Sequence, residues 1–169
     1  MVPYYLTKGY VFFCWDEATF SLKPYCARGW FLKGSQPTQK FNCSRKRFHA
    51  FGVINGKQEH YRFYDKINWK NVNDFLGYLH RRYPKLLIIW DNPPWHRHHR
   101  VKNYLNKHNI KAITFPTCSP EENPTEQAWK TTKQQAANTY YPDETSYRQA
   151  IRQKLQQKNL TPMFKYLNH

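Results

Sequence analysis

Three acidic residues of this chain stand where carboxylates could share metal ions. Asp91 directly follows the apolar run 86–90, and 34 residues separate it from Glu126, which lies in a predicted helix start. Asp16 belongs to an earlier aromatic stretch. Carboxylate oxygens are the ligands that suit Mg²⁺ or Mn²⁺. Lys and Arg number 27 against 11 Asp and Glu, a net charge of +16. Because a basic surface attracts phosphates, we expect metal-dependent chemistry on nucleic acid.

Asp16 is the most informative acid because its neighbours are apolar. Phe13, Cys14 and Trp15 precede it, and Phe20 follows. A charge buried in such surroundings is costly unless a cation pairs with it. That cation could be a Lys or Arg side chain or a metal ion. The presence of two further acidic motifs favours the metal.

Asp91 and Glu126 each have a purely structural alternative. Asp91 ends a predicted buried strand, where ligands of α/β sheets commonly bind. Because Asn92 and Pro93 follow, it could instead only cap a turn. Glu126 completes a capping box that begins at Asn123, with Pro at the first helical position. A capping Glu points back toward the helix start, so capping does not exclude metal binding.

A sheet and several helices have to position these acids. The pattern of apolar residues predicts strands at 11–20, 29–33, 47–54, 59–64, 86–90 and 110–115. Helical spacing predicts helices at about 71–83, 98–108, 124–138 and 145–157. The order is an antiparallel meander followed by alternating helices and strands. A chain of 169 residues is long enough for one core, so we expect a single domain.

Several basic residues are candidate contacts to nucleic acid. Segment 96–100 could be a metal-binding histidine tract, but its arginines would repel a cation, which favours phosphate contacts. Segment 44–47 could contact DNA, serve as a localisation signal or form a solvated strand edge. The candidate nucleic-acid-binding residues are Arg45, Lys46, Arg47, His96, Arg97, Arg100, Lys102, Lys130 and Lys133.

Cysteines and apolar runs bear on the compartment. The four cysteines lack the paired spacing of a zinc site and are interpreted as reduced thiols. No run of 18 apolar residues occurs, so we expect no membrane partner. Together these features predict a cytoplasmic protein, associated with the nucleoid through DNA.

Three segments carry a family resemblance. They are 15–20 (WDEATF), 89–92 (IWDN) with His96 beyond it, and 119–129 (SPEENPTEQAW). Together they resemble the catalytic core of mariner-like insertion-sequence transposases, members of the ribonuclease-H-like DDE superfamily, over about 11–155. The resemblance implies an α/β, ribonuclease-H-like fold with a mixed five-stranded sheet flanked by helices.

The resemblance also implies an activity and its ligands. Asp16, Asp91 and Glu126 would be the catalytic residues and would hold two Mg²⁺ or Mn²⁺ ions. The implied reaction is hydrolysis of DNA at the element ends, followed by strand transfer of the 3′-hydroxyl into target DNA. Either Glu122 or Glu126 could be the third ligand, and we favour Glu126 because it directly precedes 127–129.

The resemblance makes the partners an open question. The family carries helix-turn-helix modules before the catalytic core, whereas about ten residues precede the first strand here. We therefore expect residues 1–169 to be one catalytic domain. Recognition of the terminal repeats would come from a separate helix-turn-helix polypeptide or be lost, and the DNA complex would contain a homodimer. The alternatives are a catalytically inactive, basic nucleic-acid-binding remnant and a structure-selective nuclease of the same fold.

Overall fold

The structure is a computed structural model. It describes residues 2–23, 25–30, 32–35, 38–40, 42–116 and 123–156. The strands are β1 (Val11–Ser21), β2 (Arg47–Ile54), β3 (Glu59–Tyr64), β4 (Leu86–Trp90) and β5 (Lys111–Thr114). The helices are α1 (Val2–Thr7), α2 (Trp69–His80), α3 (His99–Lys107), α4 (Pro124–Ala136) and α5 (Glu144–Gln156).

The strands form one mixed sheet of five, in the order β3-β2-β1-β4-β5. The β1–β2 and β2–β3 pairs are antiparallel, whereas the β1–β4 and β4–β5 pairs are parallel. This arrangement confirms the predicted antiparallel meander followed by parallel strands. Since β1 and β4 are parallel neighbours, their carboxyl ends lie at the same edge of the sheet.

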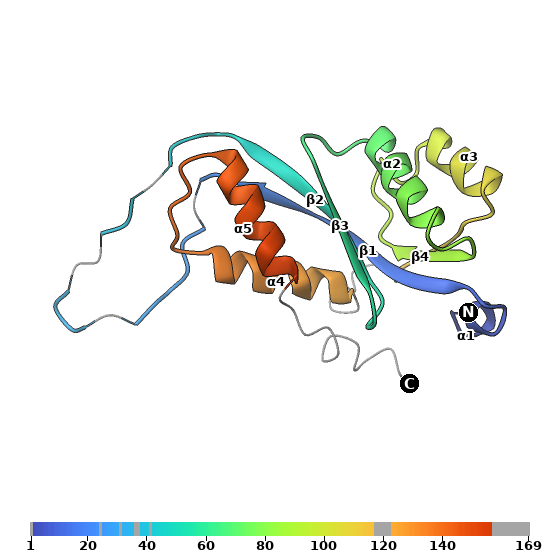
Figure 1. Cartoon of the computed structure of the whole chain (residues 1–169), viewed down its shortest axis with the longest axis horizontal. Coiled ribbons are helices and arrows are strands. Elements are labelled where there is room, and N and C mark those ends of the chain that lie inside the picture. Colours follow the sequence, from blue (N-terminus) through green and yellow to red (C-terminus); the bar gives the residue numbers. More distant parts are fainter. Residues whose placement is uncertain are drawn as a thin grey trace.

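Helices cover both faces of the sheet (Figure 1). Helices α2 and α3 pack on one face, where their apolar residues join Phe13 and Trp15 of β1 in a buried cluster. Helices α4 and α5 pack on the opposite face, against Ala18 and Phe20. Side chains alternate along a strand, so neighbouring residues of β1 point to opposite helical layers.

Local sequence explains the element boundaries near the site. β4 reads Leu-Leu-Ile-Ile-Trp and is buried along its whole length, as expected for a strand covered on both faces. Asn68 caps α2 by accepting hydrogen bonds from the backbone N–H groups of Lys70 and Asn71. Gly56 has a φ of +79°, which glycine adopts readily and which closes the β2–β3 hairpin.

One predicted strand is absent, and one helix was not predicted. The described residues of 29–33 form no strand, and Trp30 and Leu32 are 103% and 87% exposed. Their aromatic and aliphatic side chains have no neighbouring strand to pack against, and propensity alone does not form a strand. Helix α1 is short and contains no buried residue, so it has no apolar periodicity that could predict it.

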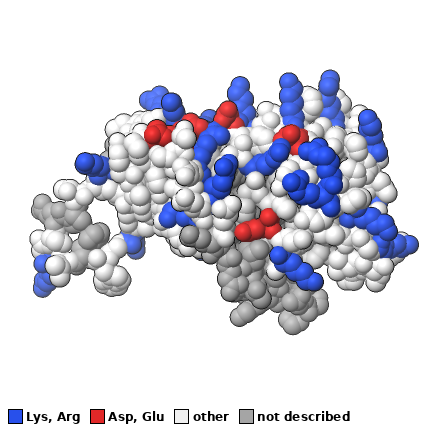
Figure 2. Space-filling model, in the orientation of Figure 1, with Lys and Arg blue, Asp and Glu red and all other residues white. Residues whose placement is uncertain are grey.

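The charges, helices and cysteines of the described residues bear on the predicted surface and compartment. Lys and Arg side chains spread over the visible face, while acidic side chains occupy a few places (Figure 2). No described helix combines the length and the apolar character needed to cross a membrane. Cys14, Cys26 and Cys43 are free thiols, and Cys118 lies outside the described residues.

Candidate active site

The sheet register places Asp16 beside Asp91. Cys14 of β1 pairs with Ile89 of β4, and each acid lies two residues further along its own chain segment. Cys14 and Ile89 share a core cluster with Ala128 of α4. The two-residue period along β1 therefore directs Asp16 toward the layer that contains α4, whereas Asp91 lies in the segment that follows β4. Asp91 directly follows β4, as the sequence predicted, and Asp16 lies within β1, two residues beyond its last parallel pair with β4.

Two buried side chains fix the start of α4 to β1. The Asn123 carboxamide oxygen accepts a hydrogen bond from the Thr125 backbone N–H (3.1 Å), and its Nδ2 donates to the Trp15 carbonyl oxygen (3.2 Å). The Thr125 hydroxyl donates to the Cys14 carbonyl oxygen (2.7 Å). These carbonyls belong to the residues just before the acid of β1. Glu126, in the first turn of α4, is thereby held next to that acid.

A close contact sets the distance between α4 and the sheet. Gly52 of β2 is the register partner of Asp16. A Cβ atom at Gly52 would lie 2.6 Å from two carbons of the Trp129 indole, far inside van der Waals contact. The absence of a side chain at this position lets the Trp129 ring lie directly on the strand.

Asp16 and Glu126 line a common pocket between β1 and α4. Its volume is about 460 Å³, and its wall also contains Tyr25, Lys130 and Lys133. The two lysines, predicted to contact nucleic acid, thus border the acids. Glu122, the alternative third ligand, lies outside the described residues.

The surroundings of Asp16 favour a cation beside its carboxylate. Burial raises the pKa of Asp16 to about 7, the carboxylates of Glu17, Asp91 and Glu126 add to the rise, and a hydrogen bond from the Glu17 backbone partly offsets it. The pKa of Asp91 is also raised, mainly by burial and then by Glu17. Among the described residues, no Lys or Arg lies within ion-pairing distance of Asp16. An all-oxygen cluster without a cationic partner fits Mg²⁺ or Mn²⁺.

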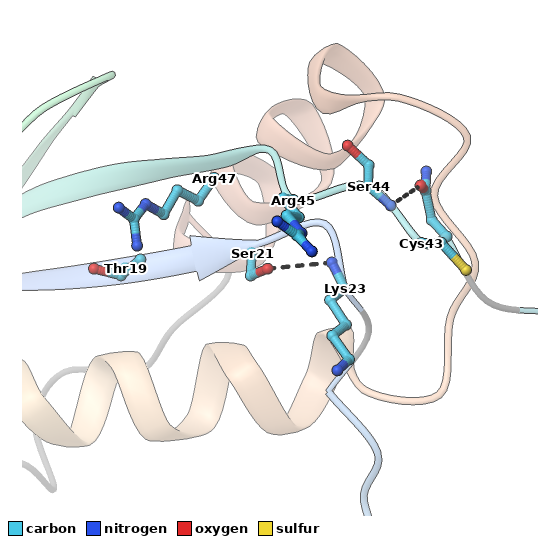
Figure 3. Close-up of a pocket in the computed structure, with 8 residues that line it drawn as sticks. Thr19, Ser21, Lys23, Cys43, Ser44, Arg45 and Arg47 are labelled. Carbon is cyan, nitrogen blue, oxygen red and sulfur yellow. Dashed lines mark hydrogen bonds between the residues drawn. The ribbon is translucent and has the colours of Figure 1, made fainter.

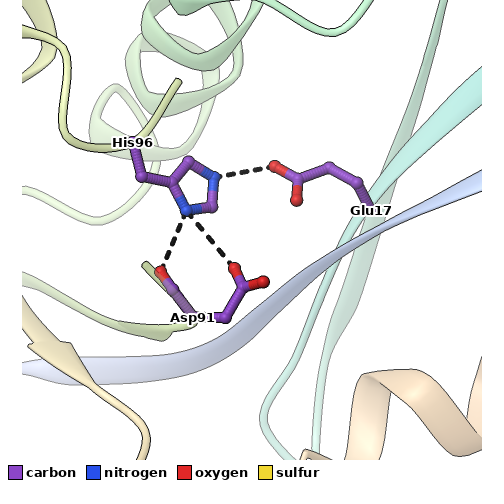
Figure 4. Close-up of side chains that lie close together, drawn as sticks. All are labelled: Glu17, Asp91 and His96. Carbon is purple, nitrogen blue, oxygen red and sulfur yellow. Dashed lines mark hydrogen bonds and ion pairs between the residues drawn. The ribbon is translucent and has the colours of Figure 1, made fainter. Parts of the chain in front are cut away.

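A second group, which includes a residue the sequence analysis missed, adjoins Asp91 (Figure 4). His96 Nε2 lies 2.8 Å from Glu17 Oε1, and Nδ1 lies 3.1 Å from the Asp91 carbonyl oxygen and 3.5 Å from its Oδ1. His96 is 3% exposed, so it offers DNA almost no surface, contrary to the contact predicted for it. Glu17 could have been noticed as a second acid beside an apolar Trp.

These three residues are the only described set of potential ligands whose donor atoms all lie within 4.8 Å of one another. Asp16, Asp91 and Glu126 do not converge so tightly. A two-ion site does not require that they do, because its ions lie about 3.5–4 Å apart and each contacts only part of the ligand set. Asp91 and Glu126 both act electrostatically on Asp16, so each lies near it.

The remaining candidate DNA contacts fall into two groups. Arg45 and Arg47 line a pocket of about 690 Å³ with Lys23, where β1 ends and β2 begins (Figure 3). Arg97, Arg100 and Lys102 are exposed at the start of α3, where Arg100 lies over the Trp69 ring. Lys46 is exposed next to the first group.

The mixed sheet and the acids at the ends of its parallel strands define a ribonuclease-H-like domain. Residues 11–148 match the family described as DDE superfamily endonuclease. The chain therefore belongs to the DDE superfamily of endonucleases, which confirms the resemblance seen in its three motifs. No curated protein matches the chain by sequence.

Solved structures share this fold at low sequence identity. The Mos1 transposase paired-end complex with left transposon end has a TM-score of 0.72 and 16% identity, over 97% of this chain and 54% of that chain. The Mos1 mariner paired-end complex with Mn has values of 0.72 and 15%, over 91% and 50%. The corresponding complex with Mg has 0.71 and 16%, over 89% and 49%. The chain thus spans about half the length of these proteins.

Proposed function

We propose that this chain is the catalytic domain of a DDE transposase. It would use Mg²⁺ or Mn²⁺ to hydrolyse DNA phosphodiester bonds at element ends and to transfer the freed 3′-hydroxyl into target DNA. The observation that carries this proposal is the half-buried carboxylate of Asp16, which has two further acids nearby and no described cationic partner. The family and the metals in related complexes support the same reaction.

Asp16, Asp91 and Glu126 would hold the metal ions. A bound pair of divalent ions supplies a water nucleophile on one side of the scissile phosphate and stabilises the leaving oxygen on the other. The protein contributes orientation, because β1 is central in the sheet and the bonds from Asn123 and Thr125 fix α4 to it. Pre-oriented carboxylates avoid reorganisation during the reaction.

The basic side chains around the acids would bind the DNA backbone. Lys130 and Lys133 border the pocket of the acids, which supports a role for them in contacting phosphates next to the scissile bond. The exposed arginines at the β1–β2 pocket and at the start of α3 would extend this contact along the DNA strand. We further propose that residues 1–169 act as one catalytic domain and that the DNA complex contains a homodimer.

The test compares cleavage with binding. Asp91→Ala should abolish Mn²⁺-dependent nicking of supercoiled plasmid while retaining DNA in a mobility-shift assay. Asp74→Asn is the matched control, because it removes an acid of α2 that pairs with Arg62 away from the site. Unchanged nicking by Asp91→Ala would refute the assignment.

The same assay separates the proposed transposase from its alternatives. Joining of a labelled 3′-hydroxyl end to a second DNA would support strand transfer. Cleavage without joining would favour a nuclease. DNA binding with no metal-dependent reaction in the wild type would favour an inactive remnant.

A further inference from the structure

Backbone pairing between β1 and β4 stops before the acids. The last register pair is Cys14 with Ile89, and the Trp90 carbonyl oxygen accepts its hydrogen bond from Phe115, beyond β5. No strand ladder therefore joins the segment of Asp91 to the segment of Asp16. Since two metal ions would have to be shared across this gap, some other contact has to set its width.

The imidazole of His96 crosses this gap. Nε2 faces Glu17 of β1, and Nδ1 faces both the carbonyl oxygen and the carboxylate of Asp91 (Figure 4). Each ring nitrogen of His96 therefore has an oxygen partner within the protein. The ring thus bridges β1 and Asp91, the residue that follows β4.

Aromatic side chains hold this bridge in one orientation. The His96 ring stacks on Trp90 at 4.2 Å with an interplanar angle of 15°, and stands edge-on to Trp15 at 5.8 Å and 90°. Trp15 Nε1 also donates to Glu17 Oε1 at 2.7 Å. The His96 and Glu17 side chains are 1% and 5% exposed, whereas that of Asp91 is 58% exposed. A buried frame therefore supports an accessible carboxylate.

The same geometry argues against a metal ion bound by these three residues. Glu17 and Asp91 contact different nitrogens, so the ring stands between the two carboxylates. One ion could reach Glu17 and His96, or Asp91 and His96, but would then have to displace a hydrogen bond of 2.8 or 3.1 Å. The group is arranged to support a ligand, not to converge on an ion.

We propose that His96 and Glu17 are positioning residues for the metal-binding carboxylate of Asp91. This inference rests on the proposed function, because it assumes that Asp91 binds a divalent ion. His96 fixes the chain where β4 ends and orients the Asp91 carboxylate, and Glu17 fixes His96. Neither residue touches the ion or DNA. Asp16 and Glu17 are adjacent in β1 and point to opposite faces. This short segment thus supplies one proposed ligand, Asp16, and also the residue that supports the other ligand, Asp91.

The experiment measures Mn²⁺ affinity of the whole chain by calorimetric titration without DNA. His96→Phe keeps an aromatic ring against Trp90 but removes both ring nitrogens, and Glu17→Gln keeps the shape while removing the charge. Loss of supporting contacts to a metal ligand costs roughly 10- to 100-fold in affinity, so each variant should weaken Mn²⁺ binding by such a factor. The double variant Glu17→Gln/His96→Phe avoids a buried unpaired charge and should show a similar loss.

His60→Phe is the matched control. His60 also packs among aromatic rings, and its Nε2 lies 2.8 Å from the Tyr83 hydroxyl, but it contacts none of the acids. It should change Mn²⁺ affinity less than twofold. Thermal unfolding without metal shows which variants fold, and if His96→Phe does not fold, Glu17→Gln decides the question.

The outcomes distinguish the two proposals. Wild-type Mn²⁺ affinity in folded Glu17→Gln and in the double variant, with only a lower unfolding temperature, would overturn the positioning role and leave the proposed function intact. Absence of Mn²⁺ binding by the wild type, or unchanged binding by Asp91→Asn, would instead overturn the proposed function.

Discussion

Asp16 and Glu17 are neighbouring acids with opposite environments. The Glu17 carboxylate points into the layer of α2 and α3, where it accepts hydrogen bonds from Trp15 and His96. The Asp16 carboxylate points toward α4 and meets the charges of other carboxylates. An acid with buried donors is complete within the protein. An acid among acids needs a cation from outside, and that difference identifies which of the two is a candidate ligand.

Replacing Asp16 should have the largest effect. Asp16→Asn removes a carboxylate that would help to hold the metal ions, so Mn²⁺-dependent nicking should fall on the order of 10³-fold or more, beyond the 10- to 100-fold expected for supporting residues. Metal-free stability should rise, because like-charge repulsion disappears. Nicking rates and urea unfolding measure the two effects. If the variant lost stability instead, repulsion among the carboxylates would not be the feature that sets Asp16 apart.

The pH dependence of stability sharpens the same contrast. The pKa of Asp16 is raised from 3.8 to about 7, so between these values the folded state binds more protons than the unfolded state. The contribution of this group to metal-free stability should therefore be largest below pH 4 and should fall by about 3 kcal/mol as pH rises to 7. The measurement is urea unfolding across this range for the wild type and for Asp16→Asn.

The control for this pH effect is metal. Asp16→Asn should remove the decline, and saturating Mn²⁺ should reduce it, because the ion replaces the proton on the carboxylate. A decline that persisted unchanged in Asp16→Asn would assign the titration to another group.

The sequence predicts part of the contrast between Asp16 and Glu17, but not all of it. Alternation along β1 put Asp16 on the same face as Cys14 and Ala18, and the apolar run of β4 predicted where Asp91 would lie. The bridge through His96 could not be derived, because its partners lie 79 and 5 residues away and their meeting depends on strand register. Apolar patterning reports which face of a strand is buried, but not which distant polar groups meet there.

The start of α4 illustrates the same limit. The capping box at Asn123 correctly predicted where the helix begins. It did not predict that Asn123 and Thr125 also bond to carbonyls of β1, since a cap describes only its own helix. The strand expected at 29–33 failed for the opposite reason, because its apolar residues have no neighbouring strand.

Thr125→Val tests whether a buried hydrogen bond positions Glu126, as His96 is proposed to position Asp91. Loss of the buried bond to the Cys14 carbonyl should destabilise the protein by about 1–3 kcal/mol, because that acceptor is left unpaired. Mn²⁺ affinity should also fall, since Glu126 would lose its fixed position. Thr131→Val is the control, because the Thr131 hydroxyl bonds only within α4, to the Gln127 carbonyl on the exposed side. Equal effects of the two variants would show that helix packing, not this anchor, places Glu126.

Gly52→Ala changes the packing between α4 and the sheet without removing any hydrogen bond. The new Cβ would lie 2.6 Å from the Trp129 ring, and overpacking of this kind costs about 1–3 kcal/mol. Gly77→Ala in α2 is the comparison, because its closest contact is the hydroxyl at the flexible end of Tyr104. Urea unfolding should show a clear loss for Gly52→Ala and a much smaller change for Gly77→Ala.

The smallest effects should come from single cations on the two faces of β1. Lys133 borders the pocket of Asp16, whereas Arg47 lines the pocket at the end of β1 and the start of β2. Either Lys133→Gln or Arg47→Gln removes one phosphate contact, so the slope of log affinity against log salt should decrease by about 1 in fluorescence anisotropy titrations with DNA. Only Lys133→Gln should also slow nicking at saturating DNA, because its charge lies beside the acids. If Arg47→Gln slowed nicking equally, the scissile phosphate would not be confined to the Asp16 side of the strand.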